Sequence, residues 1–185
     1  MKREDLWEKK TSGKTLFSGK IITLEVDEIT LPNGHSSTRE VARHCGGVAV
    51  LALSEEGNVT LVEQFRYPMD EVILELPAGK LDPTATGEEN HLLGAKRELE
   101  EETGLRAEKY TYLGYFLASP GFTDEILHMY LAQGLSQVEA HPDEDEFLNV
   151  VTLPFDTVLE KVMSGEIVDG KTVATVLKVK VLLNL

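Results

Sequence analysis

The stretch GGVAVLAL, residues 46–53, is the feature that most constrains the fold. After two glycines it is apolar without interruption, which is typical of a strand buried within a sheet. The turn-forming residues EEGN follow it, and VTLVEQFRY, residues 59–67, predicts the next strand. We therefore expect the chain to build its core on a sheet that contains a buried strand.

The remaining segments alternate between strand and helix patterns. Gly104 is well placed to end the first helix, and the valine-rich last segment has a length and position that favour a helix. Strands and helices mixed in this order predict an α/β or α+β sandwich. We expect strands at residues 71–79, 107–121, 124–135 and 148–154, and helices at 88–104, 155–165 and 170–185.

The first 44 residues have a pattern of their own. IITLEVDEITL, residues 21–31, alternates roughly with period two, PNG turns the chain, and TREVARH, residues 38–44, returns it. This predicts an antiparallel unit of two or three strands, too small to bury a core alone. We therefore divide the chain into an N-terminal β unit, residues 1–44, and a main domain, residues 45–185.

The composition excludes several classes of partner. The 185 residues carry 18 basic and 32 acidic side chains, so the formal charge is 18 − 32 = −14. This argues against nucleic acid and against an anionic membrane, because both attract a basic face. An anionic small substrate remains compatible with this charge if carboxylates hold a divalent cation beside it.

Cys45 is the one cysteine, so no disulfide can form within the chain. We expect it to be a small buried residue, because no base can be assigned to a cysteine nucleophile. The N-terminal stretch MKREDLWEKKTSGK lacks the apolar core of a signal peptide, and no apolar run is long enough to span a bilayer. We therefore expect a cytoplasmic protein.

Four acids are concentrated in AKRELEEETG, residues 95–104. Glu98, Glu101 and Glu102 are spaced i, i+3 and i+4, so on a helix their like charges share one face and repel. They also lie near the helix C-terminus, where the macrodipole disfavours anions. We expect most of these acids on a different face of the helix from the apolar residues, which are Leu92, Leu93, Ala95 and Leu99.

A run of charge often marks only a solvated face. Bound divalent cations would instead turn the repulsion among these glutamates into attraction. Mg²⁺ takes carboxylate oxygens together with phosphate oxygens of a substrate. We therefore expect a metal site on this face of the helix.

RELEEETGL, residues 97–105, resembles the Arg-Glu-apolar-x-Glu-Glu-x-Gly-apolar half of the Nudix hydrolase box. Glu89 lies eight positions before Arg97, as that pattern requires. Pro83 stands where the opening glycine is expected, so Gly79 is the matching glycine, with a spacer four residues longer than the usual five. The resemblance implies a Nudix-type α/β/α sandwich with a mixed sheet.

LVEQFRYP, ELPAGKL and SPGFTDEILHMYLA resemble one branch of that family, the ADP-ribose pyrophosphatases. A proline sixteen residues after the box glycine marks the branch, and Pro120 follows Gly104 at that separation. The resemblance implies Mg²⁺-dependent hydrolysis of ADP-ribose to AMP and ribose 5-phosphate, with Mn²⁺ as a substitute for Mg²⁺. It also implies a homodimer in which the N-terminal strands are exchanged.

The resemblance further implies roles for the acids. Glu98 and Glu102 would bind metal directly, Glu101 would bind metal or lie close behind the ligands, and the carbonyl of Ala78 would complete a site. Arg97 would orient Glu98 or pair with Glu89.

The resemblance to this branch also implies a general base in the later acidic loop HPDEDEF. Glu144 is the first candidate and Glu146 the second. Glu101 is the alternative base.

The resemblance also implies substrate contacts outside the box. Arg66 would bind the phosphates, because a guanidinium suits bidentate recognition. Arg39 would reach a site on the partner subunit, and Phe17 would either stack on adenine or belong to the core. The residues expected to line the terminal ribose are Ser119, Pro120, Gly121 and Phe122.

Two other functions remain open. Another nucleoside diphosphate derivative, such as a nucleotide sugar, could be the substrate, because pocket residues outside the box set specificity. A catalytically inactive ligand-binding regulator would have lost box carboxylates and would usually carry a DNA-binding extension. Glu98, Glu101 and Glu102 are all present, and the negative charge opposes DNA.

Overall fold

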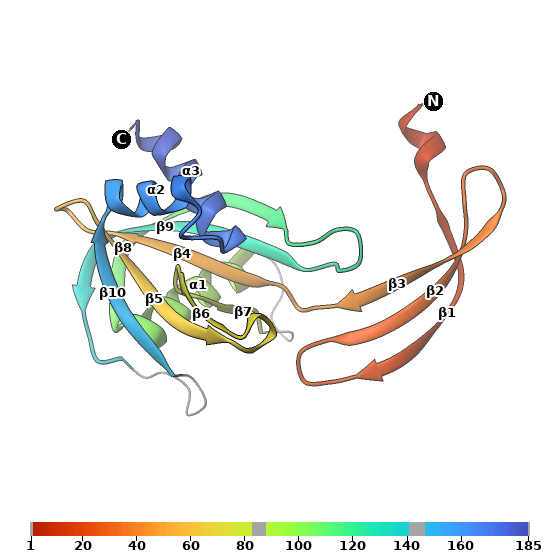
Figure 1. The fold of residues 1–185 in the computed structure, drawn as a ribbon, viewed down its shortest axis with the longest axis horizontal. Coiled ribbons are helices and arrows are strands. Elements are labelled where there is room, and N and C mark those ends of the chain that lie inside the picture. The colour runs from red at the N-terminus through yellow and green to blue at the C-terminus, as the bar shows by residue number, and fades with distance from the viewer. Residues whose placement is uncertain (1, 83–87, 141–146, 185) are drawn as a thin grey trace. The chain divides into compact units, whose positions relative to one another are not determined.

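The computed structural model describes residues 2–82, 88–140 and 147–184, with the side chains of residues 88–90 left undescribed. The chain forms two compact units (Figure 1). The first unit comprises Met1–Cys45 and Leu117–Glu125, and the second comprises Gly46–Phe116 and Ile126–Leu185. No helix in the described part of the chain is long and apolar enough to cross a bilayer.

The second unit is built on a mixed sheet with the strand order β10-β5-β4-β9-β8. The apolar run found in the sequence forms β4, and every residue of this strand is buried. It runs parallel to β9 and antiparallel to β5. The strands of this order are β4 (Gly47–Leu53), β5 (Asn58–Arg66), β8 (Leu105–Leu117), β9 (Ile126–Gln137) and β10 (Leu148–Pro154).

Helices cover both faces of this sheet, because successive residues of β4 point to opposite sides. Val48 and Val50 pack with Ala95 and Leu99 of α1 (Glu88–Thr103). Leu51 packs in a second core with residues of α2 (Phe155–Ser164) and α3 (Gly170–Leu183). The expected α/β/α sandwich is therefore confirmed.

The strand predicted over residues 71–79 is instead two short strands. β6 (Glu71–Glu75) pairs with β5, whereas β7 (Ala78–Lys80) pairs with β4. Pro77 lies between them and has no N–H to offer a ladder. Its carbonyl accepts a hydrogen bond from Val50 N at 2.9 Å, so the chain crosses here from one neighbour to the other.

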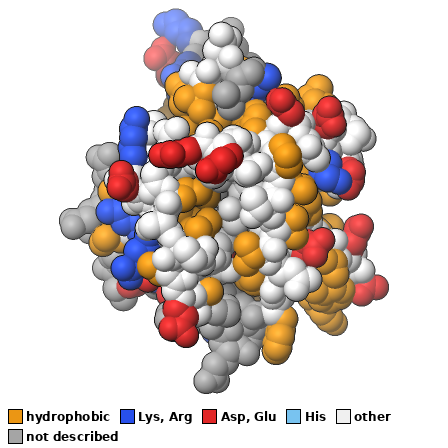
Figure 2. All heavy atoms as spheres, turned by 90° about the vertical axis from the view of Figure 1, so that its left-hand side faces the viewer, with side chains coloured by type: hydrophobic (Ala, Val, Ile, Leu, Met, Phe, Trp, Pro, Cys, Tyr) orange, Lys and Arg blue, Asp and Glu red, His pale blue; other side chains and the backbone are white. Residues whose placement is uncertain are grey.

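Acidic side chains are scattered among apolar and uncharged ones on the face shown in Figure 2. This distribution agrees with the net charge of −14. Cys45 is exposed, so the prediction that it is buried was wrong. It lies between β3 and β4, outside any strand.

The first unit is a three-stranded antiparallel sheet with the order β1-β2-β3. β1 (Lys9–Ser18) begins before the stretch in which the sequence suggested strands, and it is exposed along its whole length. A strand exposed on both faces has no apolar alternation to reveal it. The other strands are β2 (Thr23–Thr30) and β3 (Ser36–Arg43), and a short 3-10 helix, η1 (Arg3–Leu6), precedes them.

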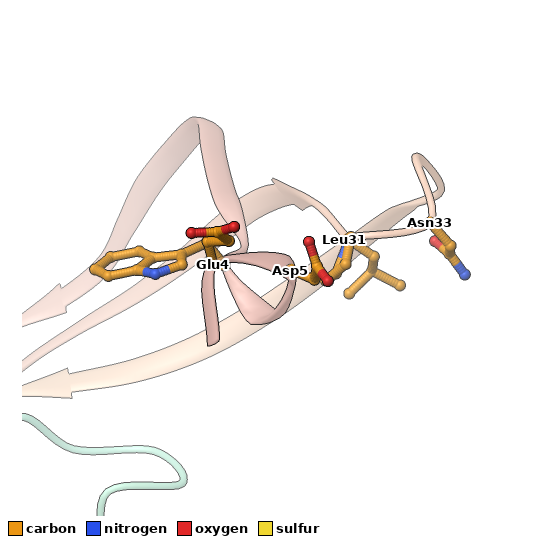
Figure 3. A pocket seen from close by; sticks show the side chains of 6 residues that line it. Glu4, Asp5, Leu31 and Asn33 are labelled. Atoms are coloured by element: carbon orange, nitrogen blue, oxygen red, sulfur yellow. The ribbon is translucent and has the colours of Figure 1, made fainter. Parts of the chain in front are cut away.

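This unit has almost no core. Among its described residues only Asp27 and Ile29 are buried, each 5% exposed. A hollow in the unit contains none of the residues predicted to bind substrate or metal (Figure 3). Its lining residues are Glu4, Asp5, Trp7, Leu31, Pro32 and Asn33.

Gly104 ends α1 in the left-handed conformation, with φ of 66°. A Cβ here would lie 2.7 Å from the side-chain nitrogen of Gln137 and 2.7 Å from the carbonyl oxygen of Val138. Gly104→Ala should therefore lower the free energy of unfolding by about 1–2 kcal/mol from the backbone conformation alone. Urea unfolding of the variant measures this loss.

Gly170→Ala is the matched control. Gly170 begins α3, and a Cβ there meets nothing within 4 Å. Equal urea midpoints for the two variants would show that Gly104 is not required for the helix end.

Candidate active site

The glutamates of α1 do not all face solvent. Glu98 is 5% exposed and Glu102 is 2% exposed, on the edge of the helix face that buries Leu99. The expectation that the acids lie largely on another face than the apolar residues therefore fails for these two. Burying a carboxylate is costly unless hydrogen bonds or cations compensate it, so these two side chains are the first candidates for a site.

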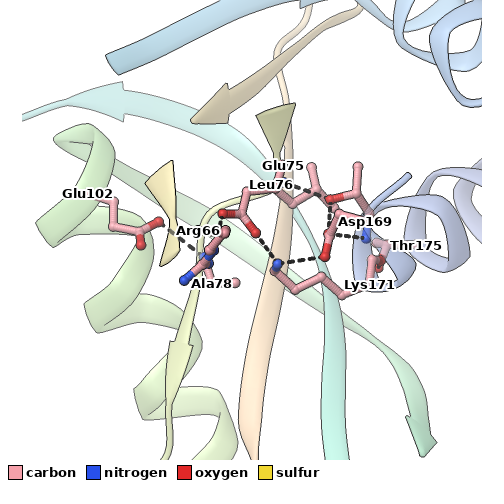
Figure 4. A network of polar contacts seen from close by, with 9 residues as sticks. Arg66, Glu75, Leu76, Ala78, Glu102, Asp169, Lys171 and Thr175 are labelled. Atoms are coloured by element: carbon pink, nitrogen blue, oxygen red, sulfur yellow. Dashed lines mark hydrogen bonds and ion pairs between the residues drawn. The ribbon is translucent and has the colours of Figure 1, made fainter. Parts of the chain in front are cut away.

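Both buried carboxylates lie against Ala78 and Gly79, the first two residues of β7. The backbone N–H of Ala78 donates to Glu102 Oε2 at 3.1 Å (Figure 4). A Cβ at Gly79 would lie 2.0 Å from the Glu98 carboxylate, so only glycine fits there. The segment with Gly79 and the acidic helix, which the sequence indicated as two halves of one motif, thus meet in space.

Arg97 holds two of the glutamates together. Its guanidinium donates to Glu98 Oε1 and to Glu101 Oε2, both at 2.6 Å, and to the carbonyl of Lys80 at 3.0 Å. Burial acts to lower the pKa of Arg97, but the charge of Glu98 and the hydrogen bond of Glu101 raise it above its ordinary value. The arginine thus orients Glu98, one of the two roles expected for it.

Glu100 belongs to a different surface. Its carboxylate accepts hydrogen bonds from Arg106 Nε at 2.7 Å and Nη2 at 2.6 Å. The four acids of the motif are therefore divided: Glu98, Glu101 and Glu102 gather near β7, and Glu100 does not.

The donor chemistry of this site fits a hard divalent cation. Two buried carboxylates meet a backbone turn whose carbonyls can supply further oxygen ligands, the donors that Mg²⁺ prefers. Arg97 carries one positive charge against the two carboxylates it contacts, so an added cation would still be attracted. Within the described ranges, no group of three or more Asp, Glu, His or Cys side chains is arranged to hold a metal.

The predicted bases Glu144 and Glu146 lie outside the described residues, and so does the side chain of Glu89. Glu101, the alternative base, is described. Its side chain is 31% exposed beside Arg97, so water can reach it.

Arg66 is the one predicted substrate contact that lies in the same unit as the acidic helix. It ends β5, and its Nε donates to the buried carboxylate of Glu75 at 2.7 Å (Figure 4). Lys171 of α3 forms an ion pair with the same carboxylate. Sequence reasoning missed Glu75 and Lys171, although a glutamate within the apolar run VILEL was a signal.

The other predicted substrate contacts belong to the first unit. Arg39 of β3 pairs with Glu8, with Nε 3.0 Å from Oε2. Phe17 of β1 is 57% exposed, so it is not a core residue within the described chain. Ser119, Pro120, Gly121 and Phe122 form a turn in which the carbonyl of Ser119 accepts from Phe122 N at 3.1 Å.

Gly79→Ala should disturb the candidate site without removing a ligand. The added methyl group displaces the Glu98 carboxylate, and misplacing a supported ligand typically weakens metal affinity about 10–100-fold. Isothermal titration with Mn²⁺ measures this loss. Gly170→Ala is again the control for a generic glycine effect, because a Cβ there meets nothing within 4 Å and Gly170 is not among the glycines with positive φ. Unchanged Mn²⁺ affinity in Gly79→Ala would contradict the assignment of Glu98.

Known proteins resemble this chain over most of its length. The NUDIX domain family matches residues 43–174. The ADP-ribose pyrophosphatase of Bacillus subtilis (strain 168) is 47% identical over 171 residues, which are 91% of this chain and 90% of that protein. The methanol dehydrogenase activator of Bacillus methanolicus is 46% identical over 174 residues, 92% of each chain.

The fold comparison agrees. A crystal structure of an ADP compounds hydrolase superposes with a TM-score of 0.81 at 22% identity, covering 97% of this chain and 96% of the other. The family match agrees with the motif on α1 and with the contacts of that helix at Ala78 and Gly79. This chain therefore belongs to the Nudix hydrolase family.

Proposed function

We propose that this protein hydrolyses the diphosphate bond of ADP-ribose to give AMP and ribose 5-phosphate, with Mg²⁺ as its metal. The packing of Glu98 and Glu102 against the Ala78–Gly79 backbone is the observation that supports this most. The relative at 47% identity, named ADP-ribose pyrophosphatase, supports the choice of substrate.

The reaction is a substitution at phosphorus. A water molecule attacks one phosphorus atom, a new P–O bond forms, and the bond from that phosphorus to the bridging oxygen breaks. The bridging oxygen stays on the other phosphate with the bonding electrons. The proton lost by the water passes to a carboxylate base.

Glu98, Glu102 and the carbonyl of Ala78 would hold the metal, with Glu101 as a ligand or close behind the ligands. Bound Mg²⁺ supplies charge neutralisation at the phosphoryl oxygens and a more acidic water. Arg97 keeps Glu98 and Glu101 in place through its two 2.6 Å bonds. Glu144 is our first candidate for the base, followed by Glu146, with Glu101 as the alternative.

Arg66 would bind the diphosphate. Phe17 would stack on adenine, Arg39 would reach the site of the partner subunit, and Ser119, Pro120, Gly121 and Phe122 would line the terminal ribose. We assign residues 1–44 to dimerisation and residues 45–185 to the hydrolase domain.

A homodimer with exchanged strands would give the coreless first unit a packing partner. The unit exposes Leu6 by 61%, Trp7 by 78% and Leu16 by 55%. Covering such side chains is favourable at about 25 cal/mol per Å² of apolar surface. We also propose a cytoplasmic location, because an exposed cysteine suits a reducing compartment.

A second candidate function comes from the other relative. A protein named methanol dehydrogenase activator is 46% identical over 92% of this chain. On this reading the protein stimulates a dehydrogenase, and adding it to a purified methanol dehydrogenase should raise the rate of methanol oxidation. An unchanged rate would contradict this second function.

A substrate panel tests the leading proposal. With Mg²⁺, ADP-ribose should yield AMP and ribose 5-phosphate in equal amounts, with a larger kcat/KM than GDP-mannose as a representative nucleotide sugar. Chromatography of the products measures both. A larger kcat/KM for GDP-mannose would overturn the choice of substrate, and no product from any nucleoside diphosphate derivative would favour a binding role.

Replacement of the buried carboxylates tests the roles within α1. Glu98→Gln and Glu102→Gln should each lower kcat about a hundredfold or more, the usual cost of removing a preorganised electrostatic contact. Glu100→Gln is the matched control, since it makes the same change on the same helix but at the carboxylate bonded to Arg106. Thermal unfolding should differ little among the three. Near-normal kcat in either of the first two would remove that residue from the site.

A further inference from the structure

A buried carboxylate with no assigned role lies beside the candidate site. Glu75 ends β6 and is 2% exposed. It accepts a hydrogen bond from Arg66 Nε at 2.7 Å and forms an ion pair with Lys171 (Figure 4). A glutamate at this depth is tolerated only with such partners, because an unpaired buried charge costs several kcal/mol.

The strand register shows how far Arg66 reaches to make this contact. Arg66 is paired with Glu71 across the β5–β6 hairpin, whereas Glu75 is paired with Val62. Because side chains alternate between faces, Arg66 and Glu75 lie on the same face but at different ends of the ladder. The side chain of Arg66 therefore runs back along the hairpin to Glu75, and its conformation is set by that carboxylate.

The start of α3 supports Glu75 from the other side. Asp169 caps this helix by accepting from Thr172 N at 3.0 Å, and it also accepts from Lys171 Nζ at 3.0 Å. Leu76 N donates to Thr172 Oγ1 at 2.9 Å, so the residue after Glu75 is fixed to the same helix turn. The two carboxylates, Glu75 and Asp169, thus balance the charges of the two cations, Arg66 and Lys171.

The network continues into the acidic site. Two residues after Leu76, Ala78 donates to Glu102. Burial acts to lower the pKa of Arg66, but the bond and charge of Glu75, with the charges of Asp169 and Glu102, raise it above its ordinary value. Arg66 therefore stays cationic within electrostatic range of Glu102, and Figure 4 shows its side chain between Glu75 and the Ala78–Glu102 contact.

We propose that Glu75, neutralised by Lys171, is a positioning residue that holds the guanidinium of Arg66 beside Glu102, so that its remaining N–H groups face the diphosphate. An arginine has five N–H donors, so the bond from Nε leaves both terminal nitrogens for phosphate oxygens. This inference rests on the proposed function, because it assigns Arg66 to the substrate of that reaction.

A double-mutant cycle in kinetics tests the proposal. Glu75→Gln should raise KM for ADP-ribose about tenfold and change kcat less than about threefold, the pattern of lost binding shared by ground and transition states. In the Arg66→Met background, Glu75→Gln should raise KM less than about twofold further, because the guanidinium that Glu75 positions is absent. An effect of equal size in both backgrounds would mean a structural role and would overturn the proposal.

Glu71→Gln is the matched control, since it makes the same change on the exposed end of the same strand. If Glu75→Gln does not fold, Glu75→Gln with Lys171→Met removes both buried charges together, and the same rise in KM is expected. A KM within twofold of the wild type, or failure of both variants to fold, would overturn the positioning role.

The wild-type protein separates this inference from the proposed function. If it hydrolyses no nucleoside diphosphate derivative, the proposed function fails and the role of Glu75 fails with it. If it turns over ADP-ribose but the effects of Glu75→Gln and Arg66→Met on KM are independent of each other, only the role of Glu75 is wrong.

Discussion

The packing of two carboxylates against the first residues of β7 is the constraint on which the site depends. Glu98 and Glu102 are almost wholly buried, and the Glu98 carboxylate occupies the space that a side chain at position 79 would need. A carboxylate at such depth requires hydrogen-bond donors and cations. Ala78 N and Arg97 supply part of this compensation, and a divalent cation would supply more.

The sheet explains why the start of β7 and α1 meet. β4 is buried on both faces, with α1 on one and α2 and α3 on the other. The chain crosses from β6 to β7 at Pro77, whose carbonyl bonds to Val50 of β4. The residues before this crossing are fixed to α3 through Thr172, and those after it are fixed to α1 through Glu102. The crossing at Pro77 is therefore anchored by helices on both faces of the sheet.

The sequence predicted the features that depend on local pattern. The apolar run predicted β4, and the helical pattern that ends at Gly104 predicted α1. On that helix, the i, i+3, i+4 spacing of Glu98, Glu101 and Glu102 predicted that they share one face. The break at Pro77 depends on a partner in β4, so local pattern alone does not predict it. β1 has no apolar alternation, so local pattern does not predict its bounds either. Glu75 and Lys171 are 96 residues apart, and only the fold makes them a pair.

We propose that the buried glutamates of α1 bind divalent cations beside Ala78 and Gly79 of β7. Anomalous scattering from crystals grown with Mn²⁺ and a non-hydrolysable ADP-ribose analogue tests it most directly. The account predicts a manganese peak in contact with the carboxylates of Glu98 and Glu102 and with the carbonyl of Ala78. No manganese at these oxygens, or manganese bound only elsewhere, would contradict it.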